Sequence, residues 1–223
     1  MTMRLGMNLS FEYSKEQAFI NKIKQVDLYG ATISPGTTRV NGYTDIIDCD
    51  SNSYPKTMSG IGAQSGNTYS QIDVTPMNGA SPPYYQSGDW VFLWSGTATT
   101  SNFSFTKGFG GSSITPSSSA QGRIVFNIAS PDSTGICVIM TGIDASHLIT
   151  SFALVHSDNE TAYNNGEVID PDWFTKFGRF QAYRFMDWWQ TNQNTSTVYP
   201  TRQPAEALWG STVPLEACVY LCN

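Results

Sequence analysis

The stretch Trp90-Val91-Phe92-Leu93-Trp94-Ser95 predicts a β-strand around which the rest of the fold can be placed. Residues two apart on a strand share a face, so Trp90, Phe92 and Trp94 lie on one side. Such a side more often faces a core than solvent. The alternative is a sugar-binding face lined by Trp90 and Trp94 together with Tyr84 and Tyr85. Of these four, we expect the two tyrosines to be exposed, because they follow Pro82-Pro83 in a loop.

Short segments of the same kind recur on both sides of this stretch. The predicted strands are Thr68–Val74, Trp90–Ser95, Asn102–Thr106, Arg123–Asn127, Ile136–Thr141 and Ile149–His156. Turn signals such as Asn78-Gly79, Pro131-Asp132 and Asp144 separate them. This spacing is typical of a sandwich or jelly roll.

The N-terminal part adds one predicted helix, from Lys15 to Val26. Ser14 and Gln17 have the spacing of a capping box. Phe19, Ile20, Ile23 and Val26 follow at helical spacing. We expect the lysines at positions 15, 22 and 24 to form a solvated face. Residues 5–9 and 40–48 are predicted strands.

The pattern changes after His156. Asp170 and Pro171 mark the start of a helix that Gly178 ends. A strand over residues 183–187 follows, and then a helix that begins at Pro214. We therefore predict a mostly β protein with a jelly-roll-like β-sandwich over residues 1–156, including one N-terminal helix. A short C-terminal α/β segment, residues 157–223, resembles the start of a (β/α)8 barrel.

The stretch from Ala182 to Asn192 concentrates residues that suit a carbohydrate ligand. Aromatic faces beside a carboxylate and an amide match the CH faces and hydroxyls of a sugar ring. The candidate carbohydrate-binding residues are Arg184, Asp187, Trp188 and Asn192, with Tyr84 and Tyr85 from the loop. The other interpretation is a strand end whose Trp pair packs on neighbours and whose Asp caps a turn.

Charge is sparse in this chain. Twelve Lys and Arg against 18 Asp and Glu give a formal net charge of −6. Without a basic cluster we expect neither nucleic-acid binding nor attraction to anionic lipid. A Ser-, Thr- and Asn-rich acidic surface fits a neutral partner such as a glycan, and it also fits an ordinary soluble surface.

The cysteines and histidines do not have the spacing of a zinc site, since His147 and His156 are isolated from the cysteines. We expect Cys49, Cys137, Cys218 and Cys222 to be thiols, which fits assembly in a reducing cytosol. Residues 1–6 lack the apolar region of a signal peptide, and no apolar run reaches membrane-spanning length. If the protein acts outside a cell, we therefore expect its release by lysis or within a particle.

A calcium loop is one interpretation of Asp48, Asp50 and Asn52, which have the D-x-D-x-N spacing. The sixth position is Ser53 instead of Gly, and the twelfth is Ser59 instead of Glu. An Asx-rich turn before Tyr54 explains these residues better. No other cofactor is indicated.

Several motifs together resemble a family. They are Gly6-Met7-Asn8-Leu9, Gln121-Gly122-Arg123-Ile124-Val125-Phe126, Arg184-Phe185-Met186-Asp187-Trp188, Thr191-Asn192 and Val213-Pro214-Leu215-Glu216. The chain resembles large phage-encoded and bacterial proteins in which an N-terminal β-sandwich precedes a glycoside-hydrolase-like barrel. The resemblance implies a sandwich of carbohydrate-binding type that leads into a barrel start. It would place Arg184, Asp187, Trp188 and Asn192 at the C-terminal rim of the barrel.

Glycoside hydrolysis requires two carboxyl groups across the scissile bond. Asp187 and Glu216 are the only local pair here, and Glu216 falls within a predicted helix. We therefore expect this chain not to hydrolyse glycans by itself. The expected role is a structural or receptor-binding component of a phage particle that contacts glycans or other virion subunits, with homo-oligomer formation left open. The alternative is the N-terminal fragment of a glycoside hydrolase with a carbohydrate-binding module.

Overall fold

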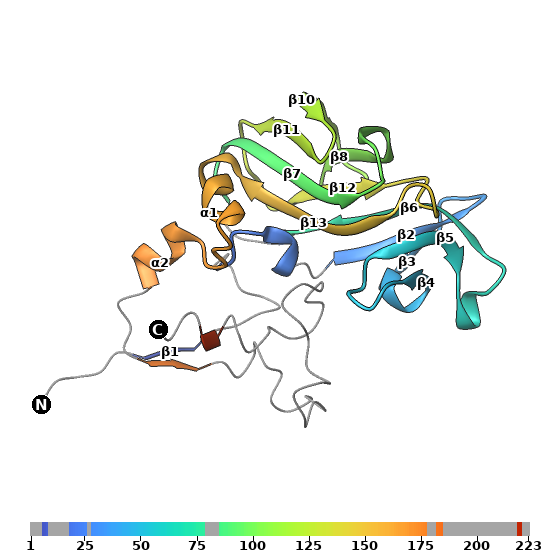
Figure 1. The fold of residues 1–223 in the computed structure, drawn as a ribbon, viewed down its shortest axis with the longest axis horizontal. Helices are drawn as coiled ribbons and strands as arrows, with labels where there is room; N and C mark the ends of the chain where they lie inside the picture. The colour runs from blue at the N-terminus through green and yellow to red at the C-terminus, as the bar shows by residue number, and fades with distance from the viewer. Residues whose placement is uncertain are drawn as a thin grey trace, which may run out of the picture.

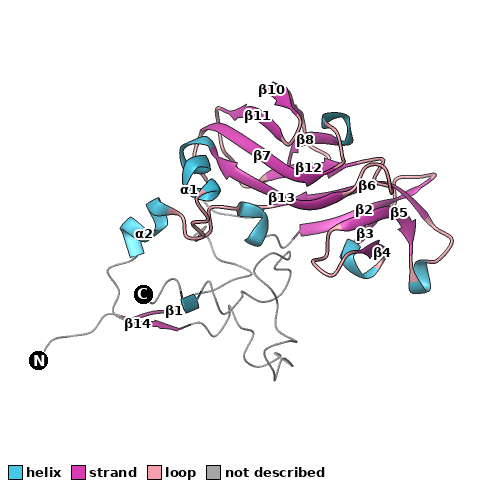
Figure 2. Cartoon of the chain, in the orientation of Figure 1, coloured by secondary structure: helices cyan, strands magenta, loops and turns pink. Residues whose placement is uncertain are grey.

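The computed structural model describes residues 6–8, 18–25, 28–78, 85–177, 182–184 and 218–219. Within these ranges the protein is mostly β, with two antiparallel sheets and a few short helices (Figure 1, Figure 2). The prediction of a mostly β, sandwich-like fold is confirmed. No helix in the described ranges is long and apolar enough to cross a membrane.

The smaller sheet is built around the strand that contains the two core tryptophans. Its order is β10 (Pro116–Ala120), β11 (Arg123–Ile128), β7 (Gly88–Gly96) and β13 (Ile149–His156). Trp90, Phe92 and Trp94 on β7 are buried between the sheets. The prediction that this side of the strand faces the core is therefore confirmed.

The larger sheet covers the other side of this core. Along its main path lie β3 (Arg39–Asn41), β2 (Leu28–Ser34), β6 (Thr68–Thr75), β12 (Ile136–Met140), β8 (Phe103–Lys107) and β9 (Ser113–Ile114). β5 (Pro55–Gly60) joins β6 and pairs with β4 (Ile47–Cys49). The single strand expected over residues 40–48 is instead β3, a 3-10 turn at Tyr43–Asp45 and the start of β4.

Aromatic rings fill the space between the sheets. The ring centroids of Phe92 and Phe103 are 4.9 Å apart, and those of Phe105 and Phe126 are 4.6 Å apart. Each pair joins one strand of the smaller sheet to one strand of the larger. Such contacts add to the free energy gained by removing the rings from water.

A second, smaller cluster lies on the outer face of the smaller sheet. Val91, Val125, Ala153 and Val155 pack there with Ile20, and Ala162 and Tyr163 cover them. The last two belong to helix α1 (Glu160–Asn164). Arg123 on β11 holds this helix through a two-bonded ion pair with Glu160, at 2.7 and 2.8 Å. Helix α1, which follows shortly after His156, therefore packs on the sandwich.

The predicted helix from Lys15 to Val26 is not confirmed. Phe19 forms an antiparallel bridge with Ile169, and only Lys22–Gln25 make a 3-10 turn. Ile20 belongs to the outer cluster whereas Ile23 belongs to the core between the sheets. Apolar residues that face two separate clusters do not suit a helix with one apolar face. Residues 15–17 and 26 lie outside the described part of the chain.

The prediction that Lys22 is solvated is also wrong, since Lys22 is 4% exposed. Its Nζ lies 2.7 Å from Asp170 Oδ2 and donates to the carbonyl of Phe19 at 2.8 Å. Burial lowers the pKa of Lys22, and the Asp170 carboxylate counteracts that effect. This ion pair ties the N-terminal segment to the residues that start the next helix.

That helix, α2 (Pro171–Phe177), begins as predicted, because the backbone N–H of Asp172 donates to Asp170 Oδ1 at 3.0 Å. Strand β14 (Ala182–Arg184) follows and pairs in parallel with β1 (Gly6–Asn8). The β1–β14 pair is separate from both sheets of the sandwich (Figure 1). It joins residues from the two predicted domains. Cys218 and Val219 are helical, in the segment where a helix was predicted.

Candidate functional site

The structure describes few of the residues predicted to bind carbohydrate. Arg184 lies in β14, at the end that pairs with Asn8. Tyr84, Asp187, Trp188 and Asn192 lie outside the described residues. Their predicted role in carbohydrate binding therefore stays a prediction.

Tyr85 is partly buried against the sandwich core. Its ring meets that of Trp90 edge to face at 5.7 Å between centroids, and burial raises its pKa. One side of the Tyr85 ring is thus occupied by the core. The tryptophan beneath it is fixed, because Trp90 Nε1 donates to the carbonyl of Gln86 at 3.1 Å.

The residues of the calcium alternative form a turn and an ion pair. Asp50 Oδ1 accepts the backbone N–H groups of Asn52 and Tyr54, both at 2.9 Å. Asp48 pairs with Lys56 at 2.9 Å on the surface. These contacts are those of the Asx-rich turn that the sequence favours. Within the described ranges no group of three His, Cys, Asp or Glu side chains is placed to hold a metal ion.

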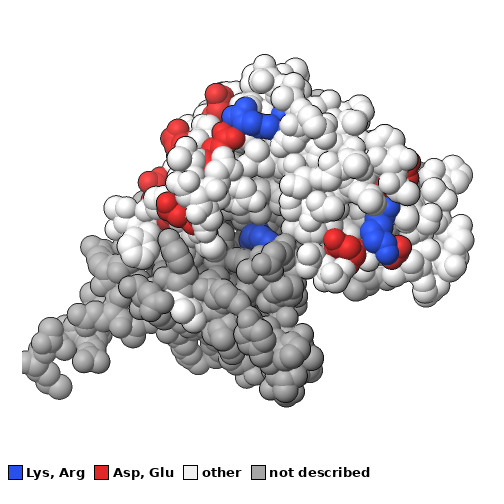
Figure 3. Space-filling view, in the orientation of Figure 1, with Lys and Arg blue, Asp and Glu red and all other residues white. Residues whose placement is uncertain are grey.

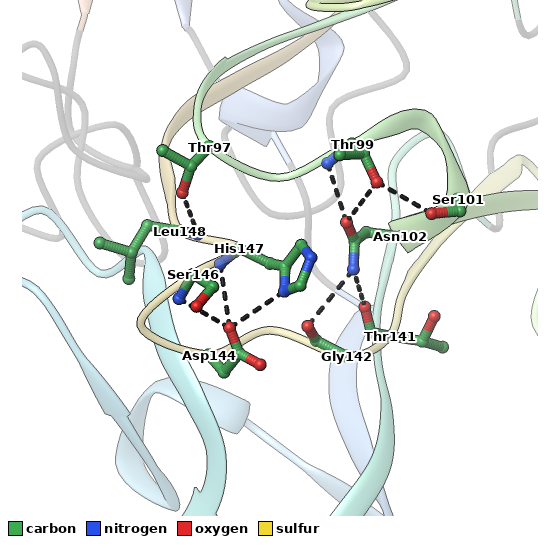
Figure 4. A network of polar contacts seen from close by, with 10 residues as sticks. All are labelled: Thr97, Thr99, Ser101, Asn102, Thr141, Gly142, Asp144, Ser146, His147 and Leu148. Carbon is green, nitrogen blue, oxygen red and sulfur yellow. Dashed lines mark hydrogen bonds and ion pairs between the residues drawn. The ribbon is translucent and has the colours of Figure 1, made fainter.

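The best-defined polar surface site lies where two loops meet at one end of the sandwich (Figure 4). We call it the loop site. It comprises residues 97–102, between β7 and β8, and residues 141–148, between β12 and β13. Thr97 and Leu148 join the loops in both directions: Leu148 N donates to Thr97 Oγ1, and Thr97 N donates to Leu148 O, each at 2.9 Å.

Asn102 is the buried centre of the loop site. Its Oδ1 accepts the N–H of Thr99 at 2.8 Å, which closes a capping box over the 3-10 turn at Thr100–Asn102. Its Nδ2 donates across to the carbonyl oxygens of Thr141 at 2.8 Å and Gly142 at 3.3 Å. One side-chain amide therefore fixes both loops relative to each other.

Asp144 organises the exposed part of the loop site. Its Oδ1 accepts the backbone N–H of Ser146 at 2.7 Å and that of His147 at 2.9 Å. His147 Nδ1 lies 3.0 Å from the same oxygen. These bonds, that from Ser146 most of all, hold the pKa of Asp144 below its ordinary value.

Of the two tautomers of a neutral His147 ring, the one with its proton on Nδ1 can donate to this carboxylate. With Nδ1–H donating to Asp144, the neutral ring presents Nε2 as an acceptor. Figure 4 shows the ring extending toward Asn102 on the facing loop. The hydroxyl of Thr99, bonded to that of Ser101 at 2.8 Å, lies on that loop. The loop site thus combines an imidazole, a carboxylate and hydroxyl groups on a fixed backbone, which suits hydrogen bonding to a polar ligand.

A second polar cluster lies on the outer face of the larger sheet, but its two charged residues pair with each other. Asp73 is fully buried, and Arg39 Nε lies 3.0 Å from both of its carboxylate oxygens. Gly30, on the strand between them, leaves room for the arginine to cross, since a Cβ there would lie 2.8 Å from Arg39 Cζ. Phe109 packs on the guanidinium at 4.7 Å. Burial raises the pKa of nearby Cys137 to about 11, which disfavours the thiolate form at neutral pH.

His156 has a structural position at the end of β13. Its Nδ1 accepts the backbone N–H of Asp158 at 3.4 Å, and Nε2 lies 3.1 Å from the carbonyl oxygen of Ser87. His156 is therefore the N-cap of the 3-10 turn at Ser157–Asn159.

The residues of the loop site were not selected from the sequence. Asp144 was recognised only as a turn signal, and His147 as an isolated histidine. The spacing of Thr99 and Asn102 is that of a capping box, and an Asp two residues before a Ser is typical of an Asx turn. Local signals of this kind reveal each loop, but not that the two loops meet.

Comparisons with models of protein families, with curated proteins and with solved structures found no match. The family resemblance of the sequence therefore stays a hypothesis, and the function must be argued from the residues.

Proposed function

We propose that this protein is a structural or receptor-binding component of a phage particle, of tail, baseplate or fibre type, that contacts glycans or other virion proteins. The observation that carries the glycan-binding proposal is the loop site, where Asn102 joins the two loops and Asp144 orders the exposed part of one of them. A jelly-roll-like connectivity and assembly in the host cytoplasm belong to the same proposal.

A fixed polar surface favours binding to a polyhydroxylated ligand. Loops that are already ordered lose less conformational entropy on binding. His147 Nε2 accepts hydrogen bonds, the carboxylate of Asp144 accepts them, and hydroxyls such as that of Ser101 both donate and accept. A neutral glycan also encounters few charges on the face shown in Figure 3, where Lys, Arg, Asp and Glu form small scattered groups.

The test is a glycan-array or affinity-gel experiment with the full chain. The variants His147→Ala, Trp188→Ala and Tyr85→Ala separate the three candidate locations, and Asn127→Ala is an exposed control on β11. Saturable binding that is lost only in His147→Ala supports the loop site. Loss in Trp188→Ala or Tyr85→Ala places the sugar at the residues predicted from the sequence. Absence of binding to every glycan leaves contact with other virion proteins and rejects the glycan proposal.

The alternative function, the N-terminal fragment of a glycoside hydrolase with a carbohydrate-binding module, is favoured by the β1–β14 pair. Neighbouring strands of a (β/α)8 barrel pair in parallel, as these two strands do. The pair also brings together two of the motifs that carry the family resemblance, since Asn8 lies opposite Arg184. Release of reducing sugar from a bound glycan, lost in Asp187→Asn, would support this alternative over a purely binding role.

A further inference from the structure

The two sheets of the sandwich have edges that are protected to different degrees. An edge strand presents unpaired N–H and C=O groups, and proteins usually cover, shorten or charge it. In the larger sheet the strands at the ends of the main path are short: β3 has three residues and β9 has two. The edges of the smaller sheet are the longer strands β13 and β10.

The β13 edge is closed by a side chain. Leu154 N donates to Asn21 Oδ1 at 3.1 Å, and Asn21 Nδ2 donates to the carbonyl oxygen of Phe152 at 3.4 Å. Asn21 is 6% exposed, so the closure is itself buried. Its amide occupies the place that a peptide group of a neighbouring strand would take.

The β10 edge lacks such a cover among the described residues. All five residues of β10 are exposed, and its one partner strand is β11. The register pairs Ser118 with Val125 and Ala120 with Arg123. In an antiparallel ladder alternate residues direct their N–H and C=O groups away from the partner. Pro116 and the adjacent bulge interrupt only the start of this edge.

The sequence around β10 is free of charge. No Lys, Arg, Asp or Glu occurs from Gly108 to Gly122, and β10 itself reads Pro-Ser-Ser-Ser-Ala. A chain with a net charge of −6 repels its own copies least where the contact is neutral. Across a two-fold axis, two copies of β10 would lie side by side. Because their side chains are small and uncharged, no like charges would face each other.

We propose that β10 is an association edge at which a second copy of this chain adds its own β10 in antiparallel orientation. The two four-stranded sheets then continue into each other across a two-fold axis. This is strand addition at an open edge, with main-chain hydrogen bonds supplying the contact. The proposal does not rest on glycan binding.

Sedimentation velocity of the full chain over a wide concentration range tests the proposal. Wild type is expected to show a monomer–dimer equilibrium. Replacing Ser118 and Ala120 together by Lys places like charges on both edges and is expected to weaken the dimer by at least about tenfold, or about 1.4 kcal/mol. Ser104→Lys is the matched control, because Ser104 is exposed on β8, which has neighbours on both sides.

Circular dichroism confirms that the variants are folded. Hydrogen exchange of the wild type gives a second readout, since the amides of β10 that point away from β11 should become more protected as the concentration rises. A chain that stays monomeric at every concentration overturns the proposal. So does a dimer that persists in the β10 variant, or one that the Ser104→Lys control also abolishes.

Discussion

Single buried polar side chains determine how the loops of this protein are held, and Asn102 is the clearest case. Replacing Asn102 by Ala leaves the N–H of Thr99 and the carbonyl oxygen of Thr141 without their partner. Removing one partner of a buried hydrogen bond costs about 1–3 kcal/mol. We expect Asn102→Ala to lower the free energy of unfolding by that amount, measured by urea denaturation. Asn127→Ala, which removes one exposed bond to Asp89, should change it little.

The Arg39–Asp73 ion pair gives a second prediction. Asp73 is fully buried, so Arg39→Met leaves its carboxylate without a cation and should destabilise the protein by about 3–5 kcal/mol. Replacing both residues by apolar ones, as in Arg39→Met with Asp73→Leu, should cost much less. Urea denaturation of the single and double variants makes the comparison. Equal losses in both would show that the arginine contributes by packing and not through its charge.

Side-chain contacts between residues far apart in the sequence could not be predicted. The side chain of Asn102 acts on residues about 40 positions further along the chain. Neither the periodicity of the strands nor a local capping motif encodes that contact. Tyr85 shows the converse, because its place after two prolines suggested exposure, yet its ring packs on Trp90.

At the scale of elements, the sequence predicted those strands whose two faces differ. Strands β6, β7, β8, β11, β12 and β13 each lie within two residues of their predicted limits. Large apolar residues on their inner faces produce the alternation that identifies them. β10 was missed because all of its residues are exposed and small. β2 was missed because Gly30, over which Arg39 passes, interrupts its pattern.

At this scale we predict that the ion pair between Arg123 and Glu160, which attaches helix α1 to the smaller sheet, weakens at low pH. Arg123 holds the pKa of Glu160 below its ordinary value of 4.5. A carboxyl group whose pKa is lower in the folded state stabilises the protein at pH values above its unfolded-state pKa. This contribution disappears as the pH falls through the folded-state pKa. We expect Glu160→Gln to be less stable than wild type near pH 7, with a difference that shrinks below about pH 4.

Thermal unfolding across this pH range measures the difference. Glu167→Gln, at an exposed position just after α1, is the control and should follow wild type throughout. If the gap between Glu160→Gln and wild type stays constant down to acidic pH, the ion pair with Arg123 does not hold the helix.

At the scale of the whole molecule, the contacts do not divide at the boundary predicted from the change of pattern after His156. The N-terminal segment bonds to the chain after that boundary: Ile20 N donates to Val168 O at 3.0 Å, and Asp170 N donates to Ala18 O at 2.8 Å. The buried Lys22–Asp170 pair lies across the same boundary. From these contacts we expect the sandwich as a folded unit to include part of the segment assigned to the barrel start.

This gives a prediction for two shortened chains. A chain of residues 1–156 loses Ala162 and Tyr163 from the outer cluster and leaves Lys22 buried without the Asp170 carboxylate. Burying a charge without its partner is strongly unfavourable, and the exposed cluster favours aggregation. We expect residues 1–156 to bind a hydrophobic dye and to lack cooperative unfolding. A chain of residues 1–177 keeps these contacts and should unfold cooperatively, as followed by calorimetry.

The variant Lys22→Met separates the two causes. In residues 1–156 it removes a buried lysine that has lost the Asp170 carboxylate, but not the exposed apolar surface, so it should restore part of the stability while dye binding persists. In the full chain the same substitution removes the cation beside the Asp170 carboxylate, which keeps its hydrogen bonds from Asn159 and Asp172, and should be destabilising. Opposite signs of one substitution in the two chains would show that the ion pair, and not the lysine alone, joins the N-terminal segment to the rest of the fold. Cooperative unfolding of residues 1–156 at the temperature of the full chain would instead place the domain boundary where the sequence pattern changes.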